Sequence, residues 1–531
     1  MRRLTLIAFA TLVAACGDTS NGDGRTGTGG TGGPSGMAGS GGTAGMAGAG
    51  GTSGSSGTAG AGGMAGGGGL AMCSESADCE DGDECTEDAC DVDQGLCEQT
   101  VLAEGAVCDF GGAAGVCQTG LCSADYYWRT PGIIEGEVGR VFHSDVAFKP
   151  DGDAVVVWYQ QGETELNIWA VEYSRTDGWA TPQRIGPIGF GDSHNPRIAF
   201  DSNGDGMAVW RQREGSGFNI WANRYTKGQG FGTAQPIGDS GGSSASPQFA
   251  MNAKGDAVAT WRQNNTIWAV LYTKATGWGV AGPIVDAQQA AAPVVDIGVN
   301  GNAVTVWSDD NDIYASRYGV GSGWSEAVLI ENNSGDAYAS DIAVDADGNA
   351  TAVWYQSTSP SSLSVFTNRY TVGQGWGSDQ RMELTPDSIS SEPKVGVDPA
   401  GNVIAVWQLG IMGRYSVRAN RYTTGDGWGV AEQISEWGDY SWGISGPELA
   451  VDRNGSAIVV WNTRYDGRHA TYSNRFTKRF GWGTAQHIDD SNPDRFSQYV
   501  AVDVDQEGRA IAVWRRGPAT DERDLWANRF E

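Results

Sequence analysis

The sequence predicts an all-β protein in which residues 126–531 form an eight-bladed β-propeller of four-stranded blades. Three observations predict this fold. A unit of about fifty residues occurs eight times, each unit has room for four short strands, and the strand that the last unit lacks is found ahead of the first unit. Short β-units repeated at such a period are typical of propellers.

The second strand of each unit is the clearest element of the repeat. A glycine is followed six positions later by a tryptophan, and the residues between them are apolar at nearly every position, as in NATAVW (349–354). Both faces of this strand must therefore be buried, as in the middle of a blade packed between two neighbours. The tryptophans are spaced by 52, 51, 46, 47, 53, 54 and 53 residues and are Trp158, Trp210, Trp261, Trp307, Trp354, Trp407, Trp461 and Trp514. We expect them in the core.

The other three strands are recognised by their position around the second. DIAVD (341–345) typifies the first strand, and the Asp-x-x-Gly segment after it has the residues of a tight hairpin. NIWANRYT (219–226) typifies the third strand, and a glycine-rich turn leads to a fourth such as GTAQPI (232–237). The turn aspartates are expected to form surface ion pairs of little energetic weight with third-strand arginines. The expected pairs are Asp201 with Arg224, Asp345 with Arg369, Asp398 with Arg421 and Asp452 with Arg475.

The two ends of the repeat region complement one another. The eighth unit stops at Glu531 without a fourth strand, whereas WRTPGII (128–134) matches the fourth-strand sequence WATPQRI (179–185). The N-terminal strand is therefore expected to complete the last blade and close a single ring, which leaves no open sheet edge.

The first fifteen residues have the properties of an export signal. Two arginines precede an apolar run that is too short to span a bilayer stably. The segment that ends in Ala15 and Cys16 resembles the lipobox of bacterial lipoproteins, which implies that Cys16 is lipidated and becomes the mature N-terminus. An ordinary signal peptide cleaved near Ala15 is the alternative. The resemblance also implies outer-membrane or surface placement rather than the inner membrane, because Gly17 and not an aspartate follows the cysteine.

A tether follows the signal. Residues 16–72 consist mostly of Gly, Ala, Ser, Thr and Met without apolar periodicity, so they are expected to be flexible. A chain of this kind has a root-mean-square reach of about 40 Å.

Residues 73–122 hold eight cysteines in an exported chain, which predicts a small module with four disulfides of open connectivity. They are Cys73, Cys79, Cys85, Cys90, Cys97, Cys108, Cys117 and Cys122. A zinc site is the alternative, but this stretch has no Cys-x-x-Cys pair and no histidine. Residues 79–97 resemble a cysteine-rich repeat of secreted bacterial proteins, which implies a spacer without chemistry of its own.

Charge and motifs limit the functional classes. Lys and Arg number 35 against 64 Asp and Glu, for a net charge of −29, and such a surface repels nucleic acid and anionic lipid. We therefore expect no nucleic-acid partner, contact with the membrane only through the lipid anchor, and a monomer. No nucleophile elbow, Walker loop or zincin motif occurs, so no catalytic residue, metal or cofactor is assigned.

Candidate binding residues lie on one side of the predicted ring. The turns between strands one and two and between three and four are nearly uniform among the units, whereas the loops on the opposite side differ in length and chemistry. We call that opposite side the variable face, and we expect binding there because such loops are carried by a rigid scaffold. The loop 435–445 adds three aromatics, and the other candidates are Asp309, Asp310, Tyr355 and Arg211. The three aromatics are Trp437, Tyr440 and Trp442. We expect them to bind a glycan or a protein; the alternative is that they cap the central channel of the propeller or a neighbouring blade.

The units resemble a tandem repeat of exported bacterial proteins, of the form AVDxxGNAxAVWxQ…IWANRYTxGxGWGxAxxI, which implies no activity by itself. Sialidase repeats differ, because there the glycine precedes the tryptophan by three positions rather than six. Arg211, Arg262 and Arg515 each follow a second-strand tryptophan, which favours a feature of the repeat over a sialidase-type arginine triad. The sequence thus predicts a tethered module that binds a glycan or a protein. The alternative is a polysaccharide-active hydrolase or lyase that uses carboxylates of the variable face, namely Asp192, Asp309, Asp310 or Asp489.

Overall fold

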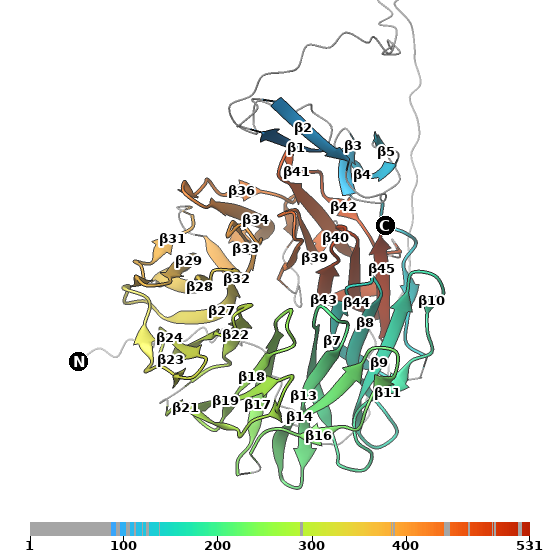
Figure 1. The fold of residues 1–531 in the computed structure, drawn as a ribbon, viewed down its shortest axis with the longest axis vertical. Helices are drawn as coiled ribbons and strands as arrows, with labels where there is room; N and C mark the ends of the chain where they lie inside the picture. The colour runs from blue at the N-terminus through green and yellow to red at the C-terminus, as the bar shows by residue number, and fades with distance from the viewer. Residues whose placement is uncertain are drawn as a thin grey trace, which may run out of the picture. The chain divides into compact units, whose positions relative to one another are not determined.

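The computed structural model describes short segments between residues 86 and 123 and most of the chain from 127 to 531. The ranges are 86–91, 96–101, 107–110, 113–118, 121–123, 127–136, 139–239, 241–286, 290–383, 385, 388–439, 446–465, 468–490, 492, 495–518 and 523–531. Every regular element within these ranges is a β-strand, which confirms the all-β prediction (Figure 1). The described part contains no helix long and apolar enough to cross a membrane.

From residue 132 to residue 531 the strands form four five-stranded antiparallel sheets, one 16-stranded sheet and one four-stranded sheet. The 16-stranded sheet contains three repeat units connected by short pairings such as Leu363 with Ile389, and we refer to each of the eight repeat units as a sheet. The first strands are β7 (Val141–Phe148), β12 (Ser193–Phe200), β17 (Ser244–Met251), β22 (Val294–Ile297), β27 (Ala337–Val344), β32 (Ile389–Val397), β38 (Glu448–Val451) and β43 (Arg495–Val504). The second strands are β8 (Ala154–Gln161), β13 (Gly206–Glu214), β18 (Ala257–Gln263), β23 (Ala303–Asp309), β28 (Ala350–Ser359), β33 (Val403–Ile411), β39 (Ala457–Tyr465) and β44 (Ala510–Pro518). The third strands are β9 (Leu166–Ser174), β14 (Gly217–Thr226), β19 (Thr266–Thr273), β24 (Asp312–Gly319), β29 (Ser362–Thr371), β34 (Arg414–Thr423), β40 (Arg468–Thr477) and β45 (Asp524–Phe530).

The outer strand of most sheets is divided into two short pieces that both pair with the third strand. In the first sheet these pieces are β10 (Gly178–Trp179) and β11 (Gln183–Arg184). The last sheet differs, because its outer strand is β6 (Gly132–Ile133), which pairs with β45 through Ile133 opposite Trp526. Trp128 also bridges to Phe530. The segment 128–134 therefore lies where the sequence comparison placed it.

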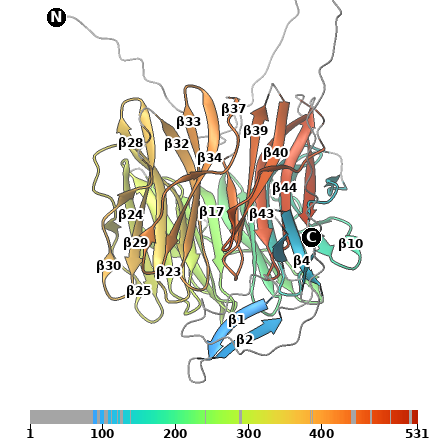
Figure 2. The same cartoon turned by 90° about the horizontal axis from the view of Figure 1, so that it is seen from above.

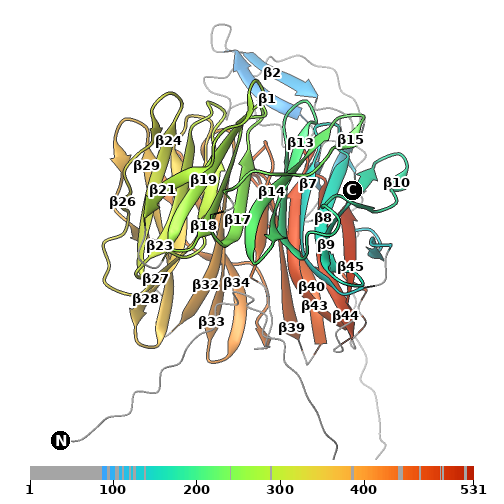
Figure 3. The ribbon, with the colours of Figure 1, turned by 90° about the horizontal axis from the view of Figure 1, so that it is seen from below.

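The first strands are arranged around a common centre (Figure 1). Each contacts the first strand of the following sheet, and β43 of the last sheet contacts β7 of the first. Figures 2 and 3 show the same sheets from the side, with their strands running in nearly the same direction. The eight sheets correspond to the eight repeat units of the sequence, and their closure into an eight-bladed ring stays a prediction.

The second-strand tryptophans occupy the core, as predicted. All eight are between 0% and 3% exposed. Several donate their indole N–H to a glutamine two residues later, as Trp158 does to Gln160 at 2.9 Å. Trp210 packs against Val157 of the preceding sheet, so each tryptophan helps to join two sheets. These contacts fix the ends of the second strands, which carry the candidate site.

The predicted turn ion pairs are only partly correct. Arg369 pairs with Asp345 at 2.9 Å, as expected. Asp201 instead pairs with Lys274 at 2.7 Å, and Arg224 pairs with Asp205 of its own hairpin. The prediction failed at Asp201 because Lys274 of the next sheet is long enough to reach the turn. A comparison of the repeat units with one another does not reveal contacts of this kind between neighbouring sheets. Asp398 is paired in the same way, with Lys478.

Five of the predicted disulfide cysteines lie on described strands. These strands are β1 (Thr86–Asp91), β2 (Leu96–Val101), β3 (Val107–Phe110), β4 (Ala113–Gln118) and β5 (Leu121–Ser123). Cys90 is opposite Cys97, and Cys117 is opposite Cys122. The signal (residues 1–15), the tether with Cys16, and Cys73, Cys79 and Cys85 lie outside the described residues, so these assignments and the disulfides stay predictions.

Candidate functional site

The variable face is formed where the first strands begin and the second strands end. One position there is the residue after the second-strand tryptophan, whose side chain lies near the start of a first strand. It is occupied by Tyr159, Arg211, Arg262, Ser308, Tyr355, Gln408, Asn462 and Arg515. Three of these eight residues are arginines, although the chain as a whole is strongly acidic. In the last, first, second and third sheets, which follow one another through contacts of their first strands, the residues at this position are Arg515, Tyr159, Arg211 and Arg262.

A row of aromatic side chains crosses the first two sheets on this face. Phe142 of β7 stacks on Tyr159 of β8 with ring centroids 4.9 Å apart. Tyr159 meets His194 of β12 at 5.3 Å, and His194 meets Phe218 of β14 at 5.6 Å. Phe142, His194 and Phe218 are partly exposed, whereas Tyr159 is buried, with 4% of its surface exposed. We call these four residues the aromatic row.

An arginine lies at each end of the aromatic row. The guanidinium carbon of Arg515 is 5.5 Å from the ring centre of Phe142, and that of Arg211 is 3.6 Å from the ring centre of Phe218. Among the described residues, no ion pair joins either arginine to a carboxylate, and the Nε atom of each is buried without a hydrogen-bond partner. The same is true of the Nε atoms of several other arginines, and the side chain of Arg515 is only 5% exposed, so a ligand would meet the terminal nitrogens of these guanidinium groups rather than Nε.

The charges near these two arginines are predominantly positive. Burial, with Arg523 and Arg140 nearby, lowers the pKa of Arg515 to about 10. Burial, with Arg262 and Arg213 nearby, also lowers the pKa of Arg211. Burial weakens the hydration of each guanidinium, and the neighbouring arginines repel it. An anion bound beside Arg515 or Arg211 would replace the lost hydration and offset the repulsion.

His143 and Tyr499 lie at the Arg515 end of the row. Their ring centroids are 4.0 Å apart, and the guanidinium carbon of Arg515 is 5.7 Å from the Tyr499 ring. Tyr499 sits in a β-bulge with φ of 53°, a conformation that is uncommon for a residue other than glycine. Burial, together with Arg197 and Arg515, lowers the pKa of His143 to about 4. The imidazole is therefore neutral at pH 7 and adds no further positive charge.

The lowered pKa of His143 predicts an acid-dependent loss of stability. The ordinary value is 6.5 and the folded value about 4, so the neutral imidazole favours the folded state fully above pH 6.5, and this contribution is lost as the pH falls from 6.5 to 4. The loss at pH 4 is on the order of 1–3 kcal/mol. We expect His143→Gln to reduce the decline of the melting temperature between pH 7 and pH 4.5. The residual decline comes in part from His469, whose pKa is also lowered to about 4. Parallel curves for the two proteins would contradict the assignment.

The predicted aromatic loop is only partly described. Trp437 is half-buried, and its carbonyl oxygen accepts a hydrogen bond from Arg414 at 3.2 Å. Tyr440 and Trp442 lie outside the described residues, so the proposed aromatic site at residues 435–445 stays a prediction.

The other predicted residues have separate surroundings. Asp309 ends β23, and Asp310 lies in the following two-residue hairpin turn with φ of 50°. Tyr355 stacks on Tyr338 at 5.1 Å, and burial raises its pKa to about 12. The described contacts bring none of these three to the aromatic row. Of these candidate binding residues, Arg211 is the one that contacts the row, through the ring of Phe218.

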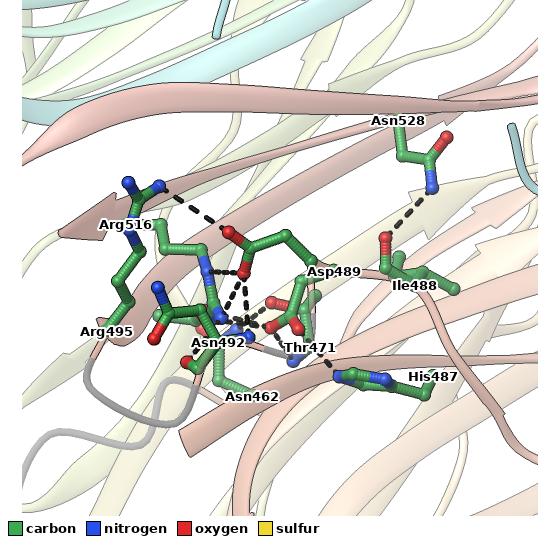
Figure 4. A network of polar contacts seen from close by, with 11 residues as sticks. Asn462, Thr471, His487, Ile488, Asp489, Asn492, Arg495, Arg516 and Asn528 are labelled. Carbon is green, nitrogen blue, oxygen red and sulfur yellow. Dashed lines mark hydrogen bonds and ion pairs between the residues drawn. The ribbon is translucent and has the colours of Figure 1, made fainter. Parts of the chain in front are cut away.

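The carboxylates considered for hydrolysis hold the scaffold together. Asp192 accepts the backbone N–H of Leu166 at 2.9 Å. Asp489 forms a fully buried ion pair with Arg516 at 2.7 Å and accepts the backbone N–H of Thr471 at 2.8 Å (Figure 4). Although burial raises the pKa of Asp489, its contacts with His487 and Arg516 outweigh this effect and lower it. Such a carboxylate is not suited to be a catalytic acid at neutral pH.

The described residues contain no group of three or more His, Cys, Asp or Glu side chains able to hold a metal ion. His143 and His194 both contact Tyr159, whereas His469 lies against Phe496 at 4.3 Å.

Sequence reasoning missed the part played by Arg515, His143, Phe142 and Phe218. The available signal was the enrichment of arginine at one position of an acidic repeat protein. We interpreted that position as a uniform feature of the repeat. The structure shows that the arginine of the last unit and the arginine of the second unit lie at the two ends of one aromatic row.

No family model and no curated protein matches this chain. Among solved structures, it is similar to a Dyadobacter fermentans protein of unknown function with 12% identity and a TM-score of 0.41, covering 76% of this chain and 99% of that one. An ulvan lyase from a new family of polysaccharide lyases shares 10% identity at a TM-score of 0.43, with 65% and 95% covered. A leech intramolecular trans-sialidase shares 11% identity at a TM-score of 0.34, with 76% and 70% covered. At these values the similarities carry no inference about activity.

Proposed function

We propose that this protein is an exported, lipid-anchored binding module that takes an acidic glycan on the variable face. The observation that carries the proposal is the pair Arg515 and Arg211, two arginines without a described carboxylate partner at the ends of an aromatic row. Guanidinium groups bind carboxylate and sulfate with two parallel hydrogen bonds, and partly exposed aromatic rings offer flat apolar surface beside them. The lipid anchor at Cys16 and the tether enter this proposal from the sequence.

Binding is favoured over hydrolysis by the surroundings of two of the four candidate carboxylates, Asp489 and Asp192. A glycosidase needs two carboxyl groups facing one substrate position, one of them with a raised pKa. Asp489 has a lowered pKa within a buried ion pair, and Asp192 accepts a backbone N–H. These contacts explain both residues as parts of the scaffold.

The test compares polysaccharide binding by the full-length protein and two arginine variants. Arg515→Gln removes one positive charge at the row, and Arg175→Gln removes one from an exposed turn whose arginine pairs with Glu507 at 3.7 Å. Heparin and polygalacturonate are expected to bind the unaltered protein and the Arg175 variant, and dextran is not. Arg515→Gln is expected to weaken binding by about 10–100-fold, since a hydrogen bond to a charged group contributes about 1.5–3 kcal/mol.

Two results would overturn the proposal. One is the absence of binding to any acidic polysaccharide, and the other is equal affinity of the Arg515 variant and the unaltered protein. The same incubations are to be checked for chain length, because shortened polysaccharide would assign the site to the lyase or hydrolase alternative.

A further inference from the structure

We infer that the site takes a linear polyanion, with one acidic group at each end of the aromatic row, rather than a single terminal acidic sugar. This inference rests on the proposed function, because it concerns the same site and specifies how the ligand is charged. It is carried by the division of the arginines into two groups with an aromatic path between them.

The two arginine groups have different members. Besides burial, the positive neighbours that lower the pKa of Arg515 are Arg523 and Arg140, whereas those that lower the pKa of Arg211 are Arg262 and Arg213. Arg515 follows the tryptophan of the last sheet, and Arg211 follows that of the second sheet. The first sheet lies between these two sheets, and each arginine lies against an outer ring of the aromatic row, Arg515 against Phe142 and Arg211 against Phe218.

Tyr159 connects the two arginine groups. It interacts electrostatically with both Arg515 and Arg211. Its ring is also central in the aromatic row, stacked on Phe142 on one side and meeting His194 on the other. Tyr159 itself is only 4% exposed, so a ligand that reaches both arginines would contact the partly exposed rings of Phe142 and His194, which Tyr159 supports from beneath.

A ligand with one acidic group would use only half of this arrangement. If its acid paired with Arg515, Arg211 would stay without an anionic partner and would lose further water beneath the ligand. Leaving a charged group desolvated and unpaired costs free energy. A chain with acidic groups on successive units pairs both arginines, and the second contact forms within an already bound complex.

The experiment measures affinity against chain length by calorimetry on the full-length protein. Two series of probes separate the sources of the anion: galacturonate oligomers from one to six units carry carboxylates, and heparin oligomers of two to eight units carry sulfate as well. We expect the affinity in at least one series to rise by about tenfold or more between the shortest probe and the length that spans the row, and to level off beyond it.

Variants separate the two ends of the row. Arg515→Gln and Arg211→Gln are each expected to reduce the affinity for the long probe to about that for the shortest one. Tyr159→Phe keeps the ring and is the matched control, with affinity within about twofold, while Tyr159→Ala removes the ring that supports Phe142 and His194 and weakens binding of the long probe. Melting temperatures near that of the unaltered protein show that the variants are folded.

The outcomes distinguish this inference from the proposed function. A single acidic sugar that binds as tightly as the longest oligomer overturns the inference alone, as does loss of long-chain binding in only one of the two arginine variants. The absence of binding in both series overturns the proposed function, and the inference with it.

Discussion

Replacing Arg516 with methionine is expected to lower the free energy of unfolding by on the order of 3–5 kcal/mol. The side chains of Arg516 and Asp489 are both 0% exposed and form an ion pair at 2.7 Å. Arg516 also bonds Asp490 at 2.5 Å and the carbonyl oxygen of Asn492 at 3.0 Å (Figure 4). Methionine fills similar space without a charge, so the carboxylate of Asp489 would stay buried without its guanidinium partner, with His487 at 2.6 Å as its remaining ion-pair partner. The midpoint of guanidinium-induced unfolding measures the loss.

A nearby arginine provides the control for this prediction. Arg495 pairs with Asp490 at 3.5 Å, but its side chain is 32% exposed. Arg495→Gln is therefore expected to change stability by less than about 1 kcal/mol. Adding Asp489→Asn to the Arg516 variant removes the buried negative charge and should restore part of the loss. Equal midpoints for the Arg516 and Arg495 variants would contradict the role assigned to the buried pair.

Aspartate in place of Ile134 is expected to destabilise the protein by about 3 kcal/mol or more, because it buries a charge where apolar side chains meet. Ile134 is 5% exposed and packs in one cluster with Val141, Val513 and Leu525. Its N–H donates to the carbonyl oxygen of Leu525 at 3.0 Å. The variant should release the segment 128–134 from β45. An unpaired strand edge promotes association between chains. A lower melting temperature with concentration-dependent light scattering is the expected observation.

The neighbouring residue on the same segment is the matched control. Ile133 is 50% exposed, so aspartate there meets water and should change stability by less than about 1 kcal/mol. If the two variants melt at the same temperature and neither associates, the N-terminal segment does not close the last sheet.

The sequence was sufficient to predict the scaffold, because each repeated feature there has a local physical cause. The Asp-x-x-Gly turn needs positive φ at its glycine, and Gly348 has φ of 85°. The continuous apolar run before Trp354 can be buried only between two neighbours, and that tryptophan is 0% exposed. The match of residues 128–134 to a fourth-strand sequence predicts the pairing of β6 with β45 that the structure contains.

The candidate site was less predictable, because the role of each of its residues depends on which repeat units lie beside one another in the folded protein. Arg515 and Arg211 are far apart in sequence, and only the arrangement of the last sheet beside the first brings both to the row of Tyr159. Asp489 was misleading for a related reason. Its sequence position suggested an accessible acid, whereas its side chain satisfies Arg516 and a backbone N–H within the sheet.

Supplying the last outer strand from the N-terminal side also has an evolutionary consequence. The two strands that must recognise one another, β6 and β45, both lie outside the span from the first to the last second strand. Unequal recombination between two units would therefore change the copy number of the repeat and leave both partners intact. New rings of different size are accessible in one step, and each would bring a different pair of units together at the crossover while the joint between β6 and β45 stays the same. The loops that meet there, and with them the ligand, could diversify without a new scaffold.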